Sequence, residues 1–315
     1  MKDKFIVITG PTASGKSDIS INIAKKINGQ IISADSQQVY REMDIGTNKV
    51  IDSIDVEHHM LNLVNPDENF TVNDFMNDSK RIITALNSRS IMPIITGGTG
   101  FYIDSLLFNM NYGEVESDEA VRQKLQELAK TKGSECLYNK LVDIDPITAN
   151  KYHMNEENRI IRALEIYEIT GEKPSDKRTG ERVLNKDIKP ILFFLNYKNR
   201  DILYRRINER VVEMVESGLI DEFEYIVDKY GLDENSQSMA AIGYKEIFPY
   251  VKGEITLDEM ISLIQRNTRR YAKRQVTWMK RYLAYPFCHE IIMDDLTKED
   301  ATSIIEDLIK GMYEF

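Results

Sequence analysis

Cysteine is scarce in this sequence, which has only Cys136 and Cys288 among its 315 residues. The two thiols lie far apart and form no CxxC pair, so neither a cysteine-based zinc site nor a disulfide is expected. Long apolar runs are also missing, because none approaches the roughly 20 residues that cross a bilayer. The N-terminal run Phe5–Thr9 is too short for a signal peptide. These absences predict a cytoplasmic protein with no membrane partner.

Basic residues are outnumbered, and the net charge of −10 taken alone argues weakly against a nucleic-acid partner. Their distribution argues the other way. Between positions 266 and 281 there are seven basic residues and no acidic one: Arg266, Arg269, Arg270, Lys273, Arg274, Lys280 and Arg281. A helix whose solvated face carried no function would normally mix the two signs. The local stripe therefore indicates an RNA-binding helix, in which Tyr271 and Trp278 could add stacking surfaces.

Five short runs rich in Ile, Val and Phe predict buried parallel strands. They are Phe5–Thr9, Gln30–Ala34, Ile91–Thr96, Pro190–Asn196 and Glu290–Met293. Helical patterns such as Ser17–Ile27 and Asn73–Asn87 lie between them, which predicts an α/β layered fold with right-handed crossovers. The long stretch 111–189 instead reads as consecutive helices ending in a polar exit loop, Gly171–Asp187. We therefore expect a core formed by residues 1–110 and 190–315, with a helical insertion domain at 111–189.

The first strand is followed by a full match to GxxxxGK[ST], formed by Gly10, Pro11, Thr12, Ala13, Ser14, Gly15, Lys16 and Ser17. Glycines in such a loop let successive N–H groups converge on an anion, and the following helix adds its positive end. Lys16 would supply a cation and Ser17 a hydroxyl ligand for Mg²⁺. The motif predicts a P-loop NTPase-like parallel sheet flanked by helices. A kinase, a GTPase and a prenyl-diphosphate enzyme would all fit it.

Two further segments follow strands and should meet the phosphate loop at the carboxyl edge of the sheet. Asp35, after the second strand, could accept a proton from a nucleophile. An Asp-Ser turn or a helix cap is an equal alternative. Thr99 lies in the glycine-rich run 97–102 after the third strand and offers a hydroxyl, although that run could equally be a simple turn.

Seven segments in a fixed order carry more information than the phosphate loop alone. They are GPTASGKS (10–17), ADSQQVYREMDIGTNK (34–49), GGTGFY (97–102), ENRIIRALEIYEITG (157–171), RRINERVVEMVESGLIDE (205–222), MAAIGYKE (239–246) and RRYAKRQVTWMKR (269–281). Together they cover most of the chain, which resembles the tRNA dimethylallyltransferases in their compact bacterial form. The resemblance implies transfer of a five-carbon prenyl group from dimethylallyl diphosphate to N6 of adenine 37, beside the tRNA anticodon. It also implies release of diphosphate and a requirement for Mg²⁺.

The resemblance assigns roles to individual residues. Asp35 matches the general base, and Thr99 and Lys16 complete the catalytic set. Residues 10–17 would bind the diphosphate, with Ser17 on the metal, and Arg206 and Arg210 would approach it. For the arginines, surface pairing with Glu209 or Glu213 is the alternative. The residues expected to contact tRNA are Asp35, Ser36, Gln37, Gln38, Thr99, Asn158, Arg159, Arg162, Arg269, Lys273, Arg274 and Trp278.

The sequence departs from the family pattern at two places. The family usually has AKP where this chain has Asn48-Lys49-Val50, which we expect to alter a loop only. It usually has Gln at position 158, where Asn158 would weaken or reshape one RNA contact. Three other functions stay open: an adenylate isopentenyltransferase acting on free nucleotides, a P-loop small-molecule kinase and a non-catalytic RNA-binding module. We expect the protein to act as a monomer.

Overall fold

The computed structural model describes residues 2–50, 55–109, 118–177 and 182–312, and the chain divides into two compact units. The first comprises residues 1–108 and 184–315, and the second comprises residues 109–183. We predicted an insertion at 111–189, so residues 184–189 were assigned to the wrong side of the boundary. The reason is a β-bridge between Phe108 and Leu184. It pairs the two places where the chain passes from one unit to the other and keeps both residues in the first unit.

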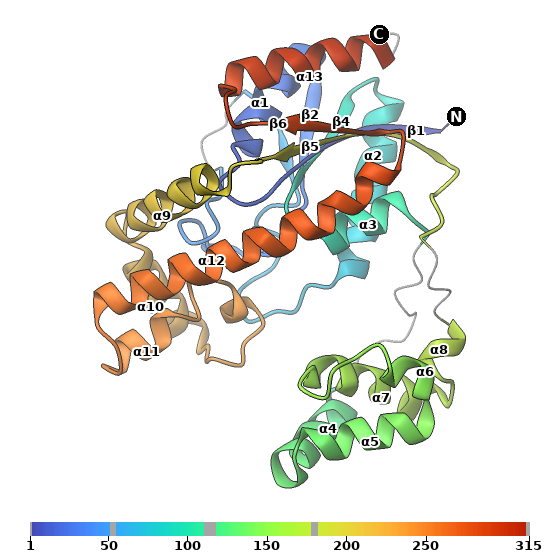
Figure 1. Ribbon diagram of the computed structural model, residues 1–315, viewed down its shortest axis with the longest axis vertical. Helices are drawn as coiled ribbons and strands as arrows, with labels where there is room; N and C mark the ends of the chain where they lie inside the picture. The colour runs from blue at the N-terminus through green and yellow to red at the C-terminus, as the bar shows by residue number, and fades with distance from the viewer. Residues whose placement is uncertain (1, 51–54, 110–117, 178–181, 313–315) are drawn as a thin grey trace. The chain divides into compact units, whose positions relative to one another are not determined.

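A six-stranded parallel sheet with the order β3-β2-β4-β1-β5-β6 forms the centre of the first unit (Figure 1). Its strands are β1 (Asp3–Thr9), β2 (Gly29–Ser33), β3 (His58–His59), β4 (Met92–Gly97), β5 (Ile188–Asn196) and β6 (Cys288–Ile292). All five predicted strands are present, displaced at their ends by a residue or two. The edge strand β3 was not predicted, because two residues are too few to produce a recognisable pattern.

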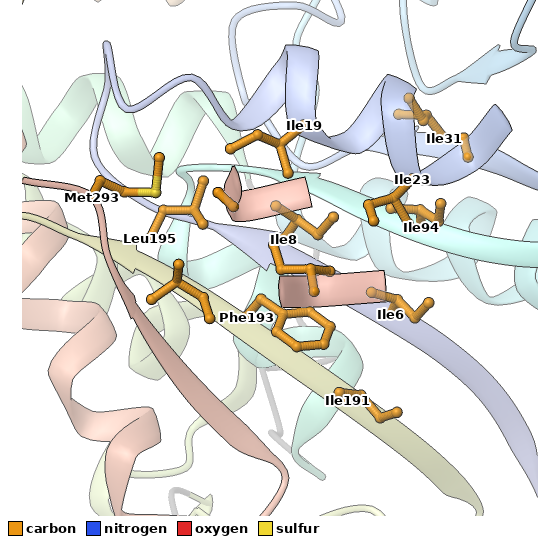
Figure 2. Close-up of a cluster of buried hydrophobic side chains, with 14 of the residues drawn as sticks. Ile6, Ile8, Ile19, Ile23, Ile31, Ile94, Ile191, Phe193, Leu195 and Met293 are labelled. Carbon is orange, nitrogen blue, oxygen red and sulfur yellow. The ribbon is translucent and has the colours of Figure 1, made fainter. Parts of the chain in front are cut away.

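The apolar runs form strands because both faces of the sheet are covered. Ile6, Ile8, Ile94 and Phe193 are fully buried, and they pack with Ile19 of α1 in one core cluster (Figure 2). Helices α1 (Lys16–Ile27) and α13 (Lys298–Met312) lie on one face, whereas α2 (Val72–Ser88) and α3 (Gly100–Leu107) lie on the other (Figure 1). This layering places the carboxyl ends of β1, β2 and β4 side by side at one edge.

Four more helices complete the first unit: α9 (Arg200–Glu216), α10 (Leu219–Tyr230), α11 (Ile247–Val251) and α12 (Leu257–Met279). The longest is α12, with 23 residues, and it contains most of the predicted basic stripe. A capping box of Thr256 and Glu259 fixes where it begins. It packs against α9 and α3 (Figure 1), so its sequence must serve packing as well as any RNA contact.

The second unit is helical, as predicted. Its helices are α4 (Glu119–Lys132), α5 (Ser134–Ile144), α6 (Pro146–Ala149), α7 (Glu157–Thr170) and α8 (Pro174–Lys177). Leu125, Leu141 and Leu164 lie in its own apolar core. Gly171 ends α7 with a left-handed φ of 71°, at the position where the predicted exit loop begins. The predicted exit loop Gly171–Asp187 is partly wrong, because α8 forms within it and the Ser175 N–H donates to Asp145 at 2.8 Å.

Candidate functional site

The segment between β1 and α1 has the geometry that its motif predicts. Ala13 and Gly15 adopt left-handed φ values of 62° and 85°, which turn the chain tightly from strand to helix. The Ser14 N–H donates to the Pro11 carbonyl at 3.2 Å within this turn. The loop therefore presents backbone N–H groups at the positive end of α1, an arrangement that favours a phosphate group.

Lys16 is the first residue of α1 and lines a cavity at this edge of the sheet. Burial lowers the pKa of Lys16 to about 8; the negative charge of Asp35 opposes this shift, and the positive charge of Arg210 adds to it. Its Nζ donates a long hydrogen bond of 3.4 Å to the Pro11 carbonyl, and no other hydrogen bond from it to a described residue is present. An ammonium group held this way gains from the arrival of an anion, because the anion offsets its lost hydration.

Arg206 and Arg210 approach the phosphate loop from α9. Arg206 Nε donates to the Ala13 carbonyl at 2.9 Å, and Arg210 Nη1 donates to Thr12 Oγ1 at 3.0 Å. Burial lowers the pKa of the Arg210 guanidinium, with the charges of Asp35 and Glu213 acting in the opposite direction. Among the described residues neither arginine forms an ion pair with Glu209 or Glu213, so the surface-pairing alternative is wrong.

Asp35 and Thr99 meet beside this loop because β2 and β4 are neighbours in the sheet. Asp35 Oδ1 accepts the Gln37 N–H at 3.0 Å, and Thr99 Oγ1 accepts the Ser36 N–H at 3.1 Å. The Asp-Ser turn considered above is therefore real, but it does not use the whole carboxylate. No described residue donates a hydrogen bond to Oδ2 of Asp35, so that oxygen is left for a ligand.

Gln38 points from the same turn toward the cavity wall. Its Oε1 accepts from Ser33 Oγ at 2.8 Å, and its Nε2 donates to the carbonyl of Thr47 at 3.2 Å. Ser36, Gln37 and Gln38 all line the cavity beside Asp35. The four predicted residues 35–38 therefore form one continuous polar wall.

The cavity has a volume of about 310 Å³, and its lining combines two kinds of side chain. Polar groups come from Thr12, Lys16, Ser17, Asp35 and Arg210. Apolar side chains come from Ile31, Val50, Leu61, Ile207, Val211, Met214 and Ile264. A ligand carrying both a phosphate and a small hydrocarbon group matches this combination.

Two residues of α12 hold the site together: Gln275, which sequence analysis missed, and Tyr271, which it considered only as a stacking surface. Gln275 is buried; its Oε1 accepts the Thr12 N–H at 2.9 Å, and its Nε2 donates to the Gly98 carbonyl at 3.1 Å. A Cβ on Gly98 would lie 2.1 Å from that Nε2, so a larger residue there would displace the Gln275 amide. Burial raises the pKa of Tyr271 to about 12, while hydrogen bonds with Thr99 and Gln275 oppose the shift. The helix thus links the phosphate loop to Thr99.

A second missed residue, Glu222 of α10, fixes the wall formed by residues 44–49. Its Oε2 accepts the N–H groups of Asp44 and Ile45 at 2.9 and 2.7 Å. Its Oε1 accepts the hydroxyl of the buried Tyr244 at 2.6 Å. Lys49 is buried below this turn, where its Nζ contacts Asp44 Oδ1 at 2.7 Å. The only sequence signal for Glu222 and Lys49 is that each lies in one of the seven segments that resemble the family.

The predicted RNA-binding residues of α12 divide into two groups. Lys273 and Arg274 are exposed, and the Arg274 guanidinium lies over the Tyr271 ring at 5.6 Å. Arg269 instead donates from Nη1 to Asn208 Oδ1 of α9 at 2.5 Å, and Trp278 is half-buried against α3. Arg269 and Trp278 therefore help to pack the fold, and their predicted contact with RNA stays a prediction.

Asn158, Arg159 and Arg162 belong to α7 in the second unit. Asn158 and Arg159 are exposed, and Arg159 Nη1 pairs with Glu156 Oε1 at 2.7 Å. Arg162 Nη1 pairs at 2.8 Å with the fully buried Glu165. A buried carboxylate needs such a partner, so Arg162 has a structural role in this unit in addition to its predicted one.

Comparison with known proteins identifies the family of the chain. The IPP transferase family model matches residues 38–282, and the isopentenyl transferase model matches residues 3–57. A tRNA dimethylallyltransferase of Thermoanaerobacter sp. strain X514 is 46% identical over 94% of this chain and 93% of its own length. The chain belongs to the tRNA dimethylallyltransferase family. The tRNA isopentenylpyrophosphate transferase structure from Bacillus halodurans is 39% identical, with a TM-score of 0.71 over 98% of this chain and 96% of that one.

A third relative extends the comparison beyond bacteria. The structure of a eukaryotic dimethylallyltransferase acting on tRNA superposes with a TM-score of 0.79 at 30% identity, covering 98% of this chain and 80% of that one. Within the described residues of this family member, no helix is long and apolar enough to span a membrane.

The structure also interprets the departure at Asn48-Lys49-Val50 from the tRNA dimethylallyltransferase pattern. Asn48 has a left-handed φ of 50°, a conformation that asparagine tolerates better than alanine does. Val50 lines the cavity. Our expectation that this departure alters only a loop was therefore too narrow, since one of its residues contributes to the cavity wall.

Proposed function

We propose that this protein transfers a dimethylallyl group from dimethylallyl diphosphate to N6 of adenosine 37 in tRNA, beside the anticodon, and releases diphosphate. The observation that carries the proposal is a cavity lined both by the phosphate loop with its cations and by apolar residues. Asp35 and Thr99 lie at the same edge of the sheet. Family membership agrees with this reaction.

The leaving group is stabilised by groups that are already in position. As the bond between C1 of the prenyl group and the diphosphate oxygen breaks, negative charge builds up on diphosphate. The N–H groups of the phosphate loop and the cations of Lys16 and Arg210 face this charge from the cavity wall. Preorganised donors in a site of low water content stabilise such charge more strongly than water does.

The nucleophile is the adenine N6, which forms a bond to C1 as the C–O bond breaks. Its excess proton moves to Asp35, whose Oδ1 is held by the Gln37 N–H while Oδ2 faces no described donor. Thr99 is held beside Asp35 by its hydrogen bond with Ser36, and it orients the adenine. Ser36, Gln37 and Gln38 provide the polar wall that holds the adenine.

Mg²⁺ is part of the proposal, because oxygen donors suited to it surround the phosphate site. Ser17 lines the cavity at the start of α1, next to Lys16. Its hydroxyl and the phosphate oxygens of the substrate would hold the ion, whose chemistry is to neutralise the diphosphate charge.

The anticodon stem-loop is the proposed RNA ligand. We propose that the protein binds it as a monomer and that it acts in the cytoplasm. The adenine must leave its stack to reach the cavity, at a cost of a few kcal/mol. Exposed cations of α12, chiefly Lys273 and Arg274, would offset that cost through phosphate contacts. Asn158, Arg159 and Arg162 are the contacts proposed for the second unit.

A label-transfer assay tests the proposal against its alternatives. Purified protein, Mg²⁺ and labelled dimethylallyl diphosphate are offered either unmodified tRNA or AMP and ATP. Label in tRNA alone is the expected result. Label in free nucleotide alone would indicate an adenylate isopentenyltransferase, and ATP hydrolysis without label would indicate a kinase. RNA binding with neither reaction would leave a non-catalytic module.

Asp35→Asn tests the assigned base. The amide cannot take up the proton, so the single-turnover rate of transfer should fall by about a hundredfold or more while tRNA affinity is kept. Thr47→Ser, on the wall of the same cavity, is the control that should leave the rate within a few-fold. An unchanged rate in Asp35→Asn with weakened tRNA binding would refute the role of Asp35 as base.

A further inference from the structure

One face of helix α9 forms part of the cavity wall. Ile207, Arg210, Val211 and Met214 all line the cavity, and their spacing of three, four and seven residues places them on the same face of the helix. At 1.5 Å of rise per residue, Ile207 and Met214 lie about 10 Å apart along the helix axis. The cavity wall therefore follows α9 for about two turns.

The phosphate loop meets α9 in the middle of the helix. Arg206 donates to the Ala13 carbonyl at 2.9 Å, and one turn later Arg210 donates to Thr12 Oγ1 at 3.0 Å. Met214 is a further turn along the same face, about 6 Å beyond Arg210 along the axis. Its side chain is apolar, so a ligand whose phosphates lie at the loop would meet Met214 through a hydrocarbon group.

The tip of the Met214 side chain lies beside a second segment of the cavity wall. A Cβ on Gly243 would lie 3.8 Å from Met214 Cε and 4.0 Å from the carbonyl oxygen of Gly46. Gly46, Ala241 and Ile242 also line the cavity. The methionine side chain therefore reaches from α9 to the segment 241–243, and it occupies space one helical turn away from the contact between Arg210 and the phosphate loop.

We infer that Met214 limits the length of the prenyl group that the cavity accepts. One five-carbon unit fits between the phosphate loop and Met214, whereas a second unit would overlap the methionine side chain. Packed side chains yield to such overlap only with strain. This inference rests on the proposed function and deepens it, because it names Met214 as the residue that restricts the donor to a diphosphate with a single five-carbon unit.

Single-turnover transfer to tRNA with two labelled donors tests the inference. The donors are dimethylallyl diphosphate and its ten-carbon homologue geranyl diphosphate, and the result is the ratio of the geranyl rate to the dimethylallyl rate. Met214→Ala should raise this ratio by about tenfold or more, because even one methylene group in an apolar pocket changes discrimination by that factor. Met214→Leu, which keeps most of the volume, should leave the ratio within a few-fold.

Val212→Ala is the matched control on the same helix. Val212 is 37% exposed and does not line the cavity, so its truncation removes apolar volume from α9 without enlarging the site. An unchanged ratio in Met214→Ala would overturn the inference, and so would an equal rise in Val212→Ala. A rise in Val50→Ala but not in Met214→Ala would place the limit elsewhere on the wall and would also overturn it. Thermal unfolding verifies that each variant is folded, and Met214→Val repeats the test with a smaller truncation.

Calorimetry with the two diphosphates in the absence of tRNA separates this inference from the proposed function. Met214→Ala should bind geranyl diphosphate more tightly than the unaltered protein does, by about tenfold or more relative to dimethylallyl diphosphate. Transfer from dimethylallyl diphosphate with unchanged ratios of rate and affinity would refute the role of Met214 alone. Absence of transfer to tRNA by the unaltered protein would refute the proposed function, and the affinity ratio would still decide whether Met214 limits the hydrocarbon group.

Discussion

Raising the pH through 8 should weaken the binding of dimethylallyl diphosphate, because burial lowers the pKa of Lys16 to about 8. Only the protonated ammonium attracts the diphosphate, and the bound anion in turn raises the pKa of Lys16. Above pH 8 each unit of pH should therefore reduce the affinity by about tenfold, or 1.4 kcal/mol. Below pH 7 the lysine is already charged, and this contribution becomes constant.

Calorimetry without tRNA measures both parts of this prediction. Titrations at pH 9 in two buffers of different ionisation enthalpy should show the uptake of nearly one proton per diphosphate bound, and titrations at pH 6.5 should show almost none. Lys16→Arg is the matched control, since its guanidinium stays charged throughout this range. Any pH dependence that comes from ionisation of the diphosphate itself also appears with Lys16→Arg and can therefore be subtracted. Identical pH profiles for the two proteins would refute the reasoning.

Three further predictions concern groups outside the phosphate loop. Lys273→Gln should reduce the slope of log affinity for tRNA against log salt by nearly one, as loss of one phosphate contact requires, whereas Lys310→Gln on α13 should not change it. Glu222→Gln should lower the free energy of urea unfolding by about 2 kcal/mol, because a charged acceptor of several hydrogen bonds becomes neutral. Gln275→Met should lower it by about 1–3 kcal/mol, since the Thr12 N–H loses its partner; unchanged unfolding would contradict either prediction.

Local patterns allowed much of the first unit to be predicted. A run such as Phe5–Thr9 predicts a buried strand, because a short continuous apolar run is typical of a strand covered on both faces. The phosphate loop follows from the need of its motif for a strand before it and a helix after it. Once β2 and β4 are neighbours, Asp35 and Thr99 must meet at the carboxyl edge. Each of these predictions depends only on residues close together in sequence or on a general rule for parallel sheets.

The groups that sequence analysis missed are polar residues whose partners lie far away along the chain. Gln275 accepts from Thr12 across 263 residues, and Glu222 accepts from Asp44 across 178. Neither contact leaves a local pattern, because a single glutamine or glutamate on a helix is ordinary on a solvated surface. Their roles depend on which helix packs against which loop, and that is decided by the whole core.

Helix α12 shows why charge alone could not separate the roles of single residues in the basic stripe. A helix turns by about 100° per residue, so a stripe of cations spread over sixteen positions cannot all face one way. Lys273 and Arg274 face solvent, whereas Arg269 faces α9 and binds Asn208. Gln275 and Tyr271, one turn apart, face the phosphate loop and Thr99. Because one helix carries both sets, a side chain proposed to bind RNA lies next in sequence to one that contacts the phosphate loop.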